Sequence, residues 1–321
     1  MRCFNSQLAP YISGFITQKQ ASGFIYEYES YILGFFDRFC IEHDYNSGTL
    51  TREMVMQWAI QRPTESKNYR NHRVSFVRQL AFYMHSLGMN PYIPLHFESE
   101  PMTIPHIFCR DELVDFFKVV DNYTPPQSSF RRLSLSYRVM FRLFYCCGFR
   151  LSEVCYLRRR CVDLKSGVIR VLQSKGDKDR LVYLADDVCA MCHDYDQCIQ
   201  AIIPDREWFF PGRCSTKPFE KTAIDKKFEE FWSRTSFAGK VDRQPTIHGL
   251  RHTFVVDKMN EWMLSGIDAD AMMPYLSRYL GHASIQETQY YFHTIEQAFP
   301  VIRSCDAMTK SVIPDVVPYE G

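Results

Sequence analysis

The sequence predicts a mainly α-helical protein with one small antiparallel β-sheet, divided into a helical N-terminal domain and an α+β C-terminal domain. Apolar residues recur at helical spacing over most of the chain. The spacing changes to every second residue between about residues 161 and 184. A proline-rich stretch separates two long patterned regions, and 321 residues with 46% hydrophobic content can supply two cores.

Residues 1–100 are predicted to form the helical domain. One helix covers IYEYESYILGFFDRFCIEH, with an apolar face of Tyr28, Ile32, Phe35, Phe36 and Phe39. A second, TREMVMQWAIQ, follows a capping Thr49 or Thr51 and stops before Pro63. A third covers TESKNYRNHRVSFVRQLAFYMHSLG, from Thr64 to Gly88, with apolar contacts from Val74, Val77, Leu80 and Phe82. Its outer side is expected to carry four basic residues: Lys67, Arg70, Arg73 and Arg78.

Residues 90–106 contain four prolines and two glutamates, which predicts an extended connection. We set the domain limits at 1–100 and 110–321, with 101–109 as the linker. The second domain begins with helices over 111–120 and 134–147. Gly148 is expected to follow the latter and Ser152 to cap the next. Arg150 then lies in a tight corner, where a buried guanidinium needs an anion.

Three short strands are predicted at 161–164, 167–173 and 180–184, with Lys175 in the second turn between them. Residues 185–245 are expected to be helical, with Phe228, Phe231 and Trp232 facing inward. The sequence Cys189-Ala-Met-Cys192-His193 has the form of a haem-attachment motif, but we interpret it as part of a helix face.

The stretch from Thr246 to His293 gathers the groups that could hold a phosphate and attack it. It contains His248, Arg251, His282 and the pair Tyr290 and Tyr291. A guanidinium matches phosphate oxygens and keeps its charge, a histidine can donate or move a proton near neutral pH, and a tyrosine can be activated as a nucleophile. Ser284 and Glu287 have the form of a capping box that starts a helix at about residue 285. Adjacent helical residues point roughly 100° apart, so only one tyrosine can face the site.

Four motifs, GFRLSE, KGDKDR, HGLRH and LGHASIQETQYY, resemble those of the tyrosine recombinases, the DNA integrases related to phage integrases and Xer proteins. The resemblance covers about residues 110–293 well and the N-terminal domain loosely. It implies a catalytic set of Arg150, Glu153, Lys175, His248, Arg251 and His282. The family nucleophile is the ninth residue after the LGH histidine, which is Tyr291, with Tyr290 as the alternative. His252 is expected to pack.

The resemblance implies cleavage and rejoining of double-stranded DNA through a 3′-phosphotyrosyl link, without metal or other cofactor. Arg150 and Arg251 would hold the non-bridging oxygens and Lys175 would protonate the leaving oxygen. The family places a DNA-clamping domain before the catalytic one and works as a tetramer, with a C-terminal segment exchanged between protomers. An integrative-element or transposon type is favoured, with accessory recombination proteins as further partners. The expected DNA contacts are Lys67, Arg70, Arg73, Arg78, Lys178 and Arg180.

Two alternatives remain open. The same residues could serve a type IB topoisomerase-like or hairpin-forming strand transferase, and a non-catalytic DNA-binding relative would keep only the basic surface. A net charge of +1 requires that any DNA surface arise from local clustering of Lys and Arg. The sequence lacks an 18-residue apolar run and an evident secretion signal, so we expect a cytoplasmic protein with reduced cysteines and no membrane contact.

Overall fold

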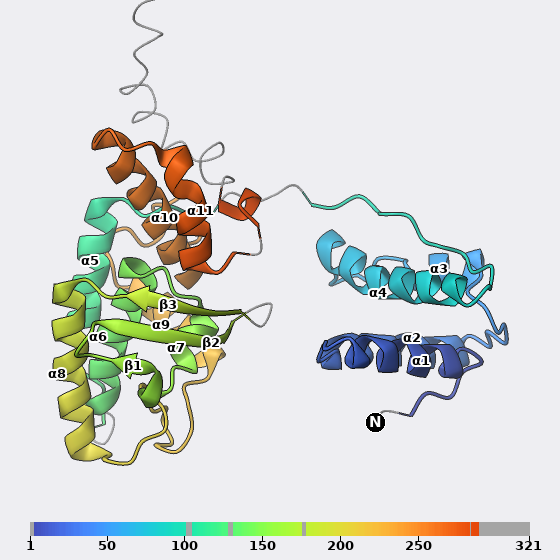
Figure 1. The fold of residues 1–321 in the computed structure, drawn as a ribbon, viewed down its shortest axis with the longest axis horizontal. Coiled ribbons are helices and arrows are strands. Elements are labelled where there is room, and N and C mark those ends of the chain that lie inside the picture. Colours follow the sequence, from blue (N-terminus) through green and yellow to red (C-terminus); the bar gives the residue numbers. More distant parts are fainter. Residues whose placement is uncertain (1–2, 101–104, 128–130, 175–177, 283, 289–321) are drawn as a thin grey trace, which may run out of the picture. The chain divides into compact units, whose positions relative to one another are not determined.

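The computed structural model describes residues 3–100, 105–127, 131–174, 178–282 and 284–288. Two compact units divide the chain, Met1–Thr103 and Ile104–Gly321. Most of the described residues are helical, and one three-stranded antiparallel sheet lies in the second unit (Figure 1). The predicted fold class is therefore confirmed. None of the helices among the described residues is long and apolar enough to cross a lipid bilayer.

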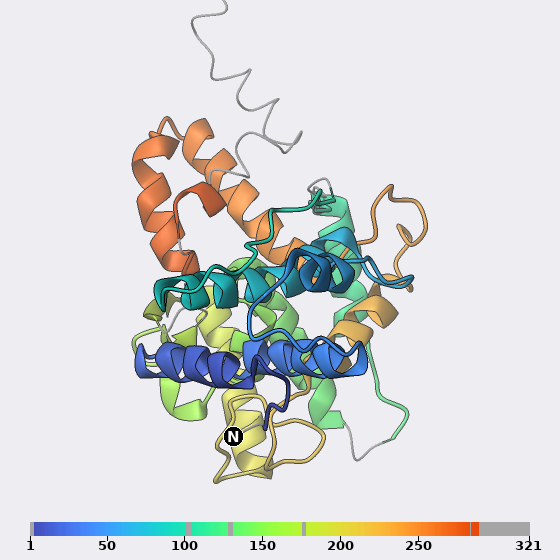
Figure 2. The ribbon, with the colours of Figure 1, turned by 90° about the vertical axis from the view of Figure 1, so that its right-hand side faces the viewer.

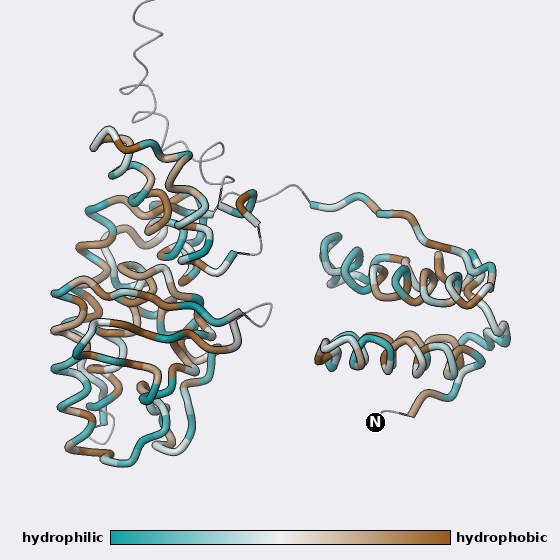
Figure 3. The backbone as a smooth tube through the Cα atoms, in the orientation of Figure 1, coloured by the Kyte–Doolittle hydropathy of each residue, from teal (hydrophilic) through white to brown (hydrophobic). Residues whose placement is uncertain are grey.

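Four helices build the first unit: α1 (Ala9–Ala21), α2 (Glu27–Glu42), α3 (Arg52–Trp58) and α4 (Lys67–Ser86). α1, α2 and α4 pack on one another and α3 packs on α2 (Figures 1 and 2). The Thr51 hydroxyl caps α3 by accepting from the Met54 amide. Apolar and polar stretches alternate along these helices (Figure 3). Tyr28 and Phe82, which we expected on apolar faces, are about half exposed.

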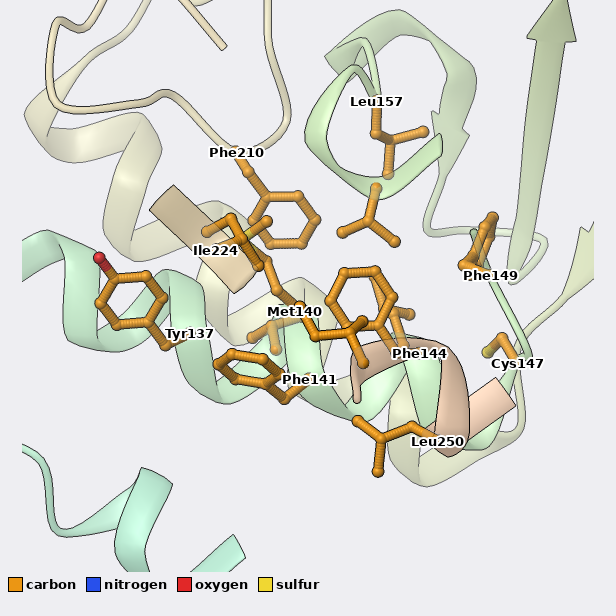
Figure 4. Packing of buried hydrophobic residues seen from close by; sticks show 14 of the residues in the cluster. Tyr137, Met140, Phe141, Phe144, Cys147, Phe149, Leu157, Phe210, Ile224 and Leu250 are labelled. Atoms are coloured by element: carbon orange, nitrogen blue, oxygen red, sulfur yellow. The ribbon is translucent and has the colours of Figure 1, made fainter. Parts of the chain in front are cut away.

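The second unit is built around α6 (Arg131–Cys146), which contacts α5 (Arg110–Asp121), α7 (Leu151–Cys155), α8 (Asp186–Ile202) and α10 (Ile247–Leu264). Phe141 and Phe144 of α6 are fully buried among side chains from distant segments (Figure 4). Fully burying one such side chain contributes roughly 1.5–3 kcal/mol. α9 (Lys221–Trp232) buries Phe228, Phe231 and Trp232, as predicted, and α11 (Ala269–Leu280) packs on α10 and β3.

The sheet has the order β1-β2-β3, with β1 at Val162–Asp163, β2 at Val168–Ser174 and β3 at Lys178–Tyr183. Ile169 pairs with Val182, and both are buried, whereas the next pair, Arg170 and Leu181, is exposed. Side chains of successive strand residues point to opposite faces, so one face of this sheet meets the core and the other stays open. A short 3₁₀ helix, η2 (Arg159–Cys161), leads into β1.

The cysteines of the haem-like motif are on α8. Cys192 is fully buried in the core, whereas His193 and Cys198 of the same helix are exposed. These side chains therefore do not face one common site. Cys189 is partly buried and its thiol donates to the Leu164 carbonyl.

Candidate active site

Arg150 is held at the corner between α6 and α7. Gly148 precedes it with φ +61°, a left-handed conformation that glycine adopts without strain. A Cβ at this glycine would lie 2.7 Å from the Phe254 ring, so a larger residue does not fit. Arg150 itself is the N-cap of α7, with extended backbone angles. The prediction that Ser152 caps this helix is wrong, because the N-cap is Arg150, two residues earlier, and Ser152 lies within the helix.

Glu153 joins the two arginines at this corner. Its carboxylate accepts from the Arg150 amide at 2.8 Å and from Arg150 Nη1 at 2.9 Å. Arg180 donates to both Glu153 oxygens, at 2.6 and 2.7 Å. Burial alone would raise the pKa of Glu153, but the bonds from Arg180 and Arg150 outweigh it and lower that pKa. The carboxylate is therefore ionised at neutral pH and fixes the Arg150 side chain.

Arg180 supports the site from β3, and its predicted role as a phosphate contact is corrected. The residue is 8% exposed, and besides Glu153 its Nε donates to the Tyr279 carbonyl at 2.7 Å. All three guanidinium nitrogens are thus engaged within the protein. The alternating pattern of the strand did not predict that Arg180 is buried and paired, because its acceptors lie 27 and 99 residues away along the chain.

Arg251 enters the same place from α10. The helix is capped by Thr246, whose hydroxyl accepts from the Gly249 amide, and His248 and Arg251 are three residues apart on one helical face. Arg251 is 1% exposed. Its Nη1 donates to the Gly148 carbonyl at 2.5 Å and its Nη2 to the Leu280 carbonyl at 2.8 Å. The guanidinium therefore connects the α6–α7 corner to the end of α11.

The LGH turn completes the cluster after α11. Gly281 caps that helix with φ +66°, and the amides of Gly281 and His282 donate to the Arg278 and Ser277 carbonyls. Arg150 Nη2 donates to the Gly281 carbonyl at 2.6 Å. A Cβ on Gly281 would lie 3.2 Å from Arg180 Nη1 and 3.3 Å from Arg150 Nη1. Glycine is required here by the backbone conformation and by the nearby arginines.

Both site histidines are neutral at neutral pH. Burial, followed by the charges of Arg251 and Arg150, lowers the pKa of His248 to about 4 and that of His282 to about 3. Each ring therefore offers one N–H donor and one acceptor nitrogen. The His252 ring packs edge-on against His248 with centroids 4.4 Å apart, and burial lowers its pKa to about 3. A bound anion would favour protonation of these rings.

The arrangement suits the binding of an oxyanion. A guanidinium has five N–H donors, of which Arg150 uses one on Glu153 and one on Gly281. Preorganised donors stabilise negative charge as it develops in a transition state. The structure thus brings together Arg150, Glu153, His248, Arg251 and His282 from three separate segments. Lys175, Tyr290 and Tyr291 lie outside the described residues, and of Lys178 only the backbone is described.

The basic residues of α4 have contacts within the first unit. Arg73 is 1% exposed and donates to both carboxylate oxygens of Glu65 and to two backbone carbonyls. Its predicted place on the outer side is wrong, since Glu65 and the end of α3 enclose it. Lys67 pairs with Glu98 at 3.0 Å and Arg70 donates to the Glu98 carbonyl at 3.2 Å. Arg78 donates to the Pro94 carbonyl at 2.6 Å.

Sequence reasoning missed a second basic region, which we call the arginine surface: Arg158, Arg160 and Arg170. These residues line a hollow of about 630 Å³ that also includes Arg150 and Glu153. Arg160 and Arg170 are exposed, and neither guanidinium has an ion-pair partner within the described ranges. Arg159, in contrast, turns inward to Asp196 at 2.5 Å. The run of three arginines in the sequence was the available signal.

Residues 110–298 match the phage integrase family. The y4rB integrase/recombinase of Sinorhizobium fredii is 25% identical over 254 residues, covering 75% of this chain and 79% of that protein. The tyrosine recombinase XerC of Xylella fastidiosa is 28% identical over 207 residues, covering 64% of this chain and 62% of that one.

Two solved structures are similar in fold. One is the XerH site-specific recombinase bound to a palindromic difH substrate, with TM-score 0.62 and 18% identity, covering 86% of this chain and 78% of that one. The other is the Tn1549 transposon integrase with a circular intermediate DNA, with TM-score 0.63 and 13% identity, covering 92% and 98%. At these identities the likeness concerns the fold alone.

Proposed function

The chain belongs to the phage integrase family, and we propose from this premise that it is a site-specific DNA recombinase acting through a phosphotyrosyl intermediate. One observation carries the proposal: Arg150 donates to the Gly281 carbonyl of the LGH turn, and Arg251 donates to the Gly148 carbonyl beside Arg150. Two motifs separated by about a hundred residues are thereby joined at one anion site. Such a site has the charge and rigidity that phosphoryl transfer requires.

The proposed reaction is a direct displacement at phosphorus. The Tyr291 phenol oxygen attacks the scissile phosphorus and forms a new P–O bond, which links the tyrosine to the 3′-phosphate, as the bond from phosphorus to the 5′ oxygen breaks. Arg150, Arg251 and His282 donate to the non-bridging oxygens, and His248 takes the phenol proton. Lys175 gives a proton to the departing 5′ oxygen. A 5′-hydroxyl from a second duplex then reverses the step, so the phosphodiester is restored without an external energy source.

The arginine surface is proposed to bind the DNA backbone beside the scissile phosphate. Its hollow is continuous with Arg150, and arginine forks match phosphate oxygens. The Arg158 guanidinium lies 5.1 Å from the Trp208 ring and its Nη1 donates to Glu207 Oε1 at 2.5 Å, and these two contacts orient its remaining donors. Lys178 and the α4 residues Lys67, Arg70 and Arg78 remain proposed contacts, and those of α4 must exchange partners in the 94–98 segment to reach phosphate.

The larger assembly is also a proposal. We propose that residues 1–100 clamp the duplex opposite the catalytic unit 110–321, and that four protomers act on two synapsed duplexes. An exchange of two duplexes requires four strand cleavages, which supports four active sites. Transposition or integration of a mobile element, with accessory proteins, is the favoured setting, and the cytoplasm is the compartment in which this DNA would be met.

The test begins with DNA that becomes covalently attached to the protein in cells, because its sequence identifies the target. A nicked duplex of that sequence then traps the cleaved state, since the short 5′ end diffuses away. Wild-type protein is expected to form an adduct, and Tyr291→Phe is expected to bind the duplex without forming one. Tyr290→Phe is the matched control and should still react.

The same experiment decides between the alternatives. An adduct in Tyr291→Phe, or its loss only in Tyr290→Phe, would refute the assigned nucleophile. Relaxation of supercoiled plasmid by the protein without recombinant product from paired sites would favour the topoisomerase-like alternative. Duplex binding with no adduct from the wild-type protein would favour the non-catalytic one.

A further inference from the structure

His282 is fixed at two points by the described residues around it. Its amide donates to the Ser277 carbonyl at 3.0 Å, which anchors the backbone at the end of α11. Its ring nitrogen Nδ1 lies 2.7 Å from Oγ1 of Thr288. Ser284 is held against α11 as well, since the Ser277 hydroxyl donates to the Ser284 carbonyl at 3.3 Å. The ring therefore has a determined orientation, with Nε2 at its opposite edge.

Thr288 is well placed to act on this ring. The residue is fully buried, and its amide donates to the Ile285 carbonyl at 2.8 Å. It belongs to the helical residues 286–288, and in the sequence it precedes Tyr291 by three positions. Because neither the backbone nor the side chain faces open solvent, the hydroxyl proton must find an acceptor inside the protein.

The direction of the hydrogen bond follows from that requirement. Among the described residues, the hydroxyl of Thr288 has His282 Nδ1 as its single hydrogen-bond partner. If Nδ1 carried the imidazole proton, the hydroxyl would be a buried donor without an acceptor in this part of the chain, which costs about 1–3 kcal/mol. If Nδ1 is unprotonated, the hydroxyl donates to it and both groups are satisfied. The second arrangement is therefore favoured.

We infer that Thr288 is a positioning residue that holds His282 as the tautomer with its proton on Nε2. This inference rests on the proposed function, in which His282 donates to a phosphate oxygen. A neutral imidazole has only one N–H, and the lowered pKa of His282 keeps the free ring neutral. The wrong tautomer would direct a lone pair, instead of a proton, at the negative phosphate. Thr288 thus selects the productive form before DNA arrives.

A pair of variants isolates the hydroxyl. Thr288→Val keeps the shape and removes the donor, whereas Thr288→Ser keeps the donor. The full-length protein labelled with ¹⁵N-histidine is examined at pH 7 by long-range proton–nitrogen correlation, with His282→Gln used to assign the signals. The wild type and Thr288→Ser are expected to show unprotonated Nδ1 and protonated Nε2. Thr288→Val is expected to show averaging between the two tautomers.

Cleavage of the nicked duplex provides the second measurement. Thr288→Val should cleave about tenfold more slowly, the equivalent of one hydrogen bond in the transition state, with unchanged affinity for the duplex. Thr288→Ser should recover most of the rate. A protonated Nδ1 in the wild type, or a tautomer unchanged in Thr288→Val, overturns the inference whatever the rate, and so does full cleavage by Thr288→Val. If the wild type forms no adduct, the proposed function falls, and the nitrogen spectra still decide the Thr288–His282 relationship.

Discussion

Arg180 and Glu153 form a buried ion pair with two parallel hydrogen bonds, at 2.6 and 2.7 Å. The pair connects β3 to α7, and the same guanidinium reaches α11 through the Tyr279 carbonyl. Glu153 in turn holds Arg150, so the ion pair fixes the relative positions of three segments that carry site residues. Because all three guanidinium nitrogens of Arg180 have acceptors within the protein, this charge serves the geometry of the site.

Replacing Arg180 should therefore destabilise the protein. We expect Arg180→Gln to lower the free energy of unfolding by about 3 kcal/mol, because it leaves the buried Glu153 carboxylate without its main partner. The neighbouring cross-strand position supplies the control. Arg170 is exposed, and Arg170→Gln should change stability by less than about 0.5 kcal/mol. Chemical denaturation measures both, and equal losses would contradict the assignment.

Arg170 and Arg180 should differ in the opposite way in DNA binding: replacement of Arg170 should weaken it, whereas replacement of Arg180 should not remove a phosphate contact. Arg160→Gln and Arg170→Gln are each expected to weaken duplex binding and to reduce the slope of log affinity against log salt by about one, since each removes a phosphate contact. Arg180→Gln should leave the slope unchanged. Fluorescence anisotropy of a labelled duplex over a range of KCl concentrations measures this.

Arg234, which pairs with Glu230 on α9, provides a control for loss of charge alone. Arg234→Gln should change neither affinity nor slope. An undiminished slope in both Arg160→Gln and Arg170→Gln would remove the arginine surface from the DNA interface.

Two glycines allow backbone strain to be separated from crowding. Gly281 and Gly239 both have positive φ, +66° and +72°, but a Cβ meets the arginines at Gly281 and nothing within 4 Å at Gly239. Alanine at either position should cost about 1 kcal/mol in stability through the left-handed conformation. Only Gly281→Ala should also slow cleavage, since it displaces Arg150 and Arg180. Cleavage of the nicked duplex at wild-type rate by Gly281→Ala would contradict this.

Buried histidines should make the protein less stable in mild acid. Folding lowers the pKa of His252 from 6.5 to about 3, so between these values the unfolded state binds more protons than the folded state. The unfolding free energy is therefore highest above pH 6.5 and decreases as the pH falls. At pH 5 the decrease due to His252 is at most about 2 kcal/mol. His252→Phe should reduce the difference in unfolding free energy between pH 7.5 and pH 5 by about 1–2 kcal/mol.

His193 is the matched control, since it is exposed on α8. His193→Gln should retain the full pH difference of the wild type. If both variants behaved alike in denaturation at the two pH values, His252 would not be the source of the acid sensitivity.

Local patterns were enough to predict much of this structure. The change from helical to alternating spacing located the sheet, and Gly148 with the following arginine indicated the corner. Hydrogen bonds and ion pairs between distant segments could not be predicted from the sequence. Arg73 sits in a run of basic residues at helical spacing, yet its acceptors lie in the preceding connection and at the end of α3. Thr288 gave no signal either, because its role depends on a ring six residues earlier.

The hydrogen bonds from Arg150 and Arg251 to the end of α11 also have a consequence for synthesis and folding of the chain. Arg150 and Arg251 take carbonyl oxygens of Gly281 and Leu280 as acceptors. A chain still being synthesised, or one truncated before α11, has neither oxygen. Such a chain retains the Arg150 contact with Glu153 and the Arg251 contact with the Gly148 carbonyl, but each guanidinium lacks its second acceptor. The anion site therefore takes its final form only after α11 and the turn that follows it have been made.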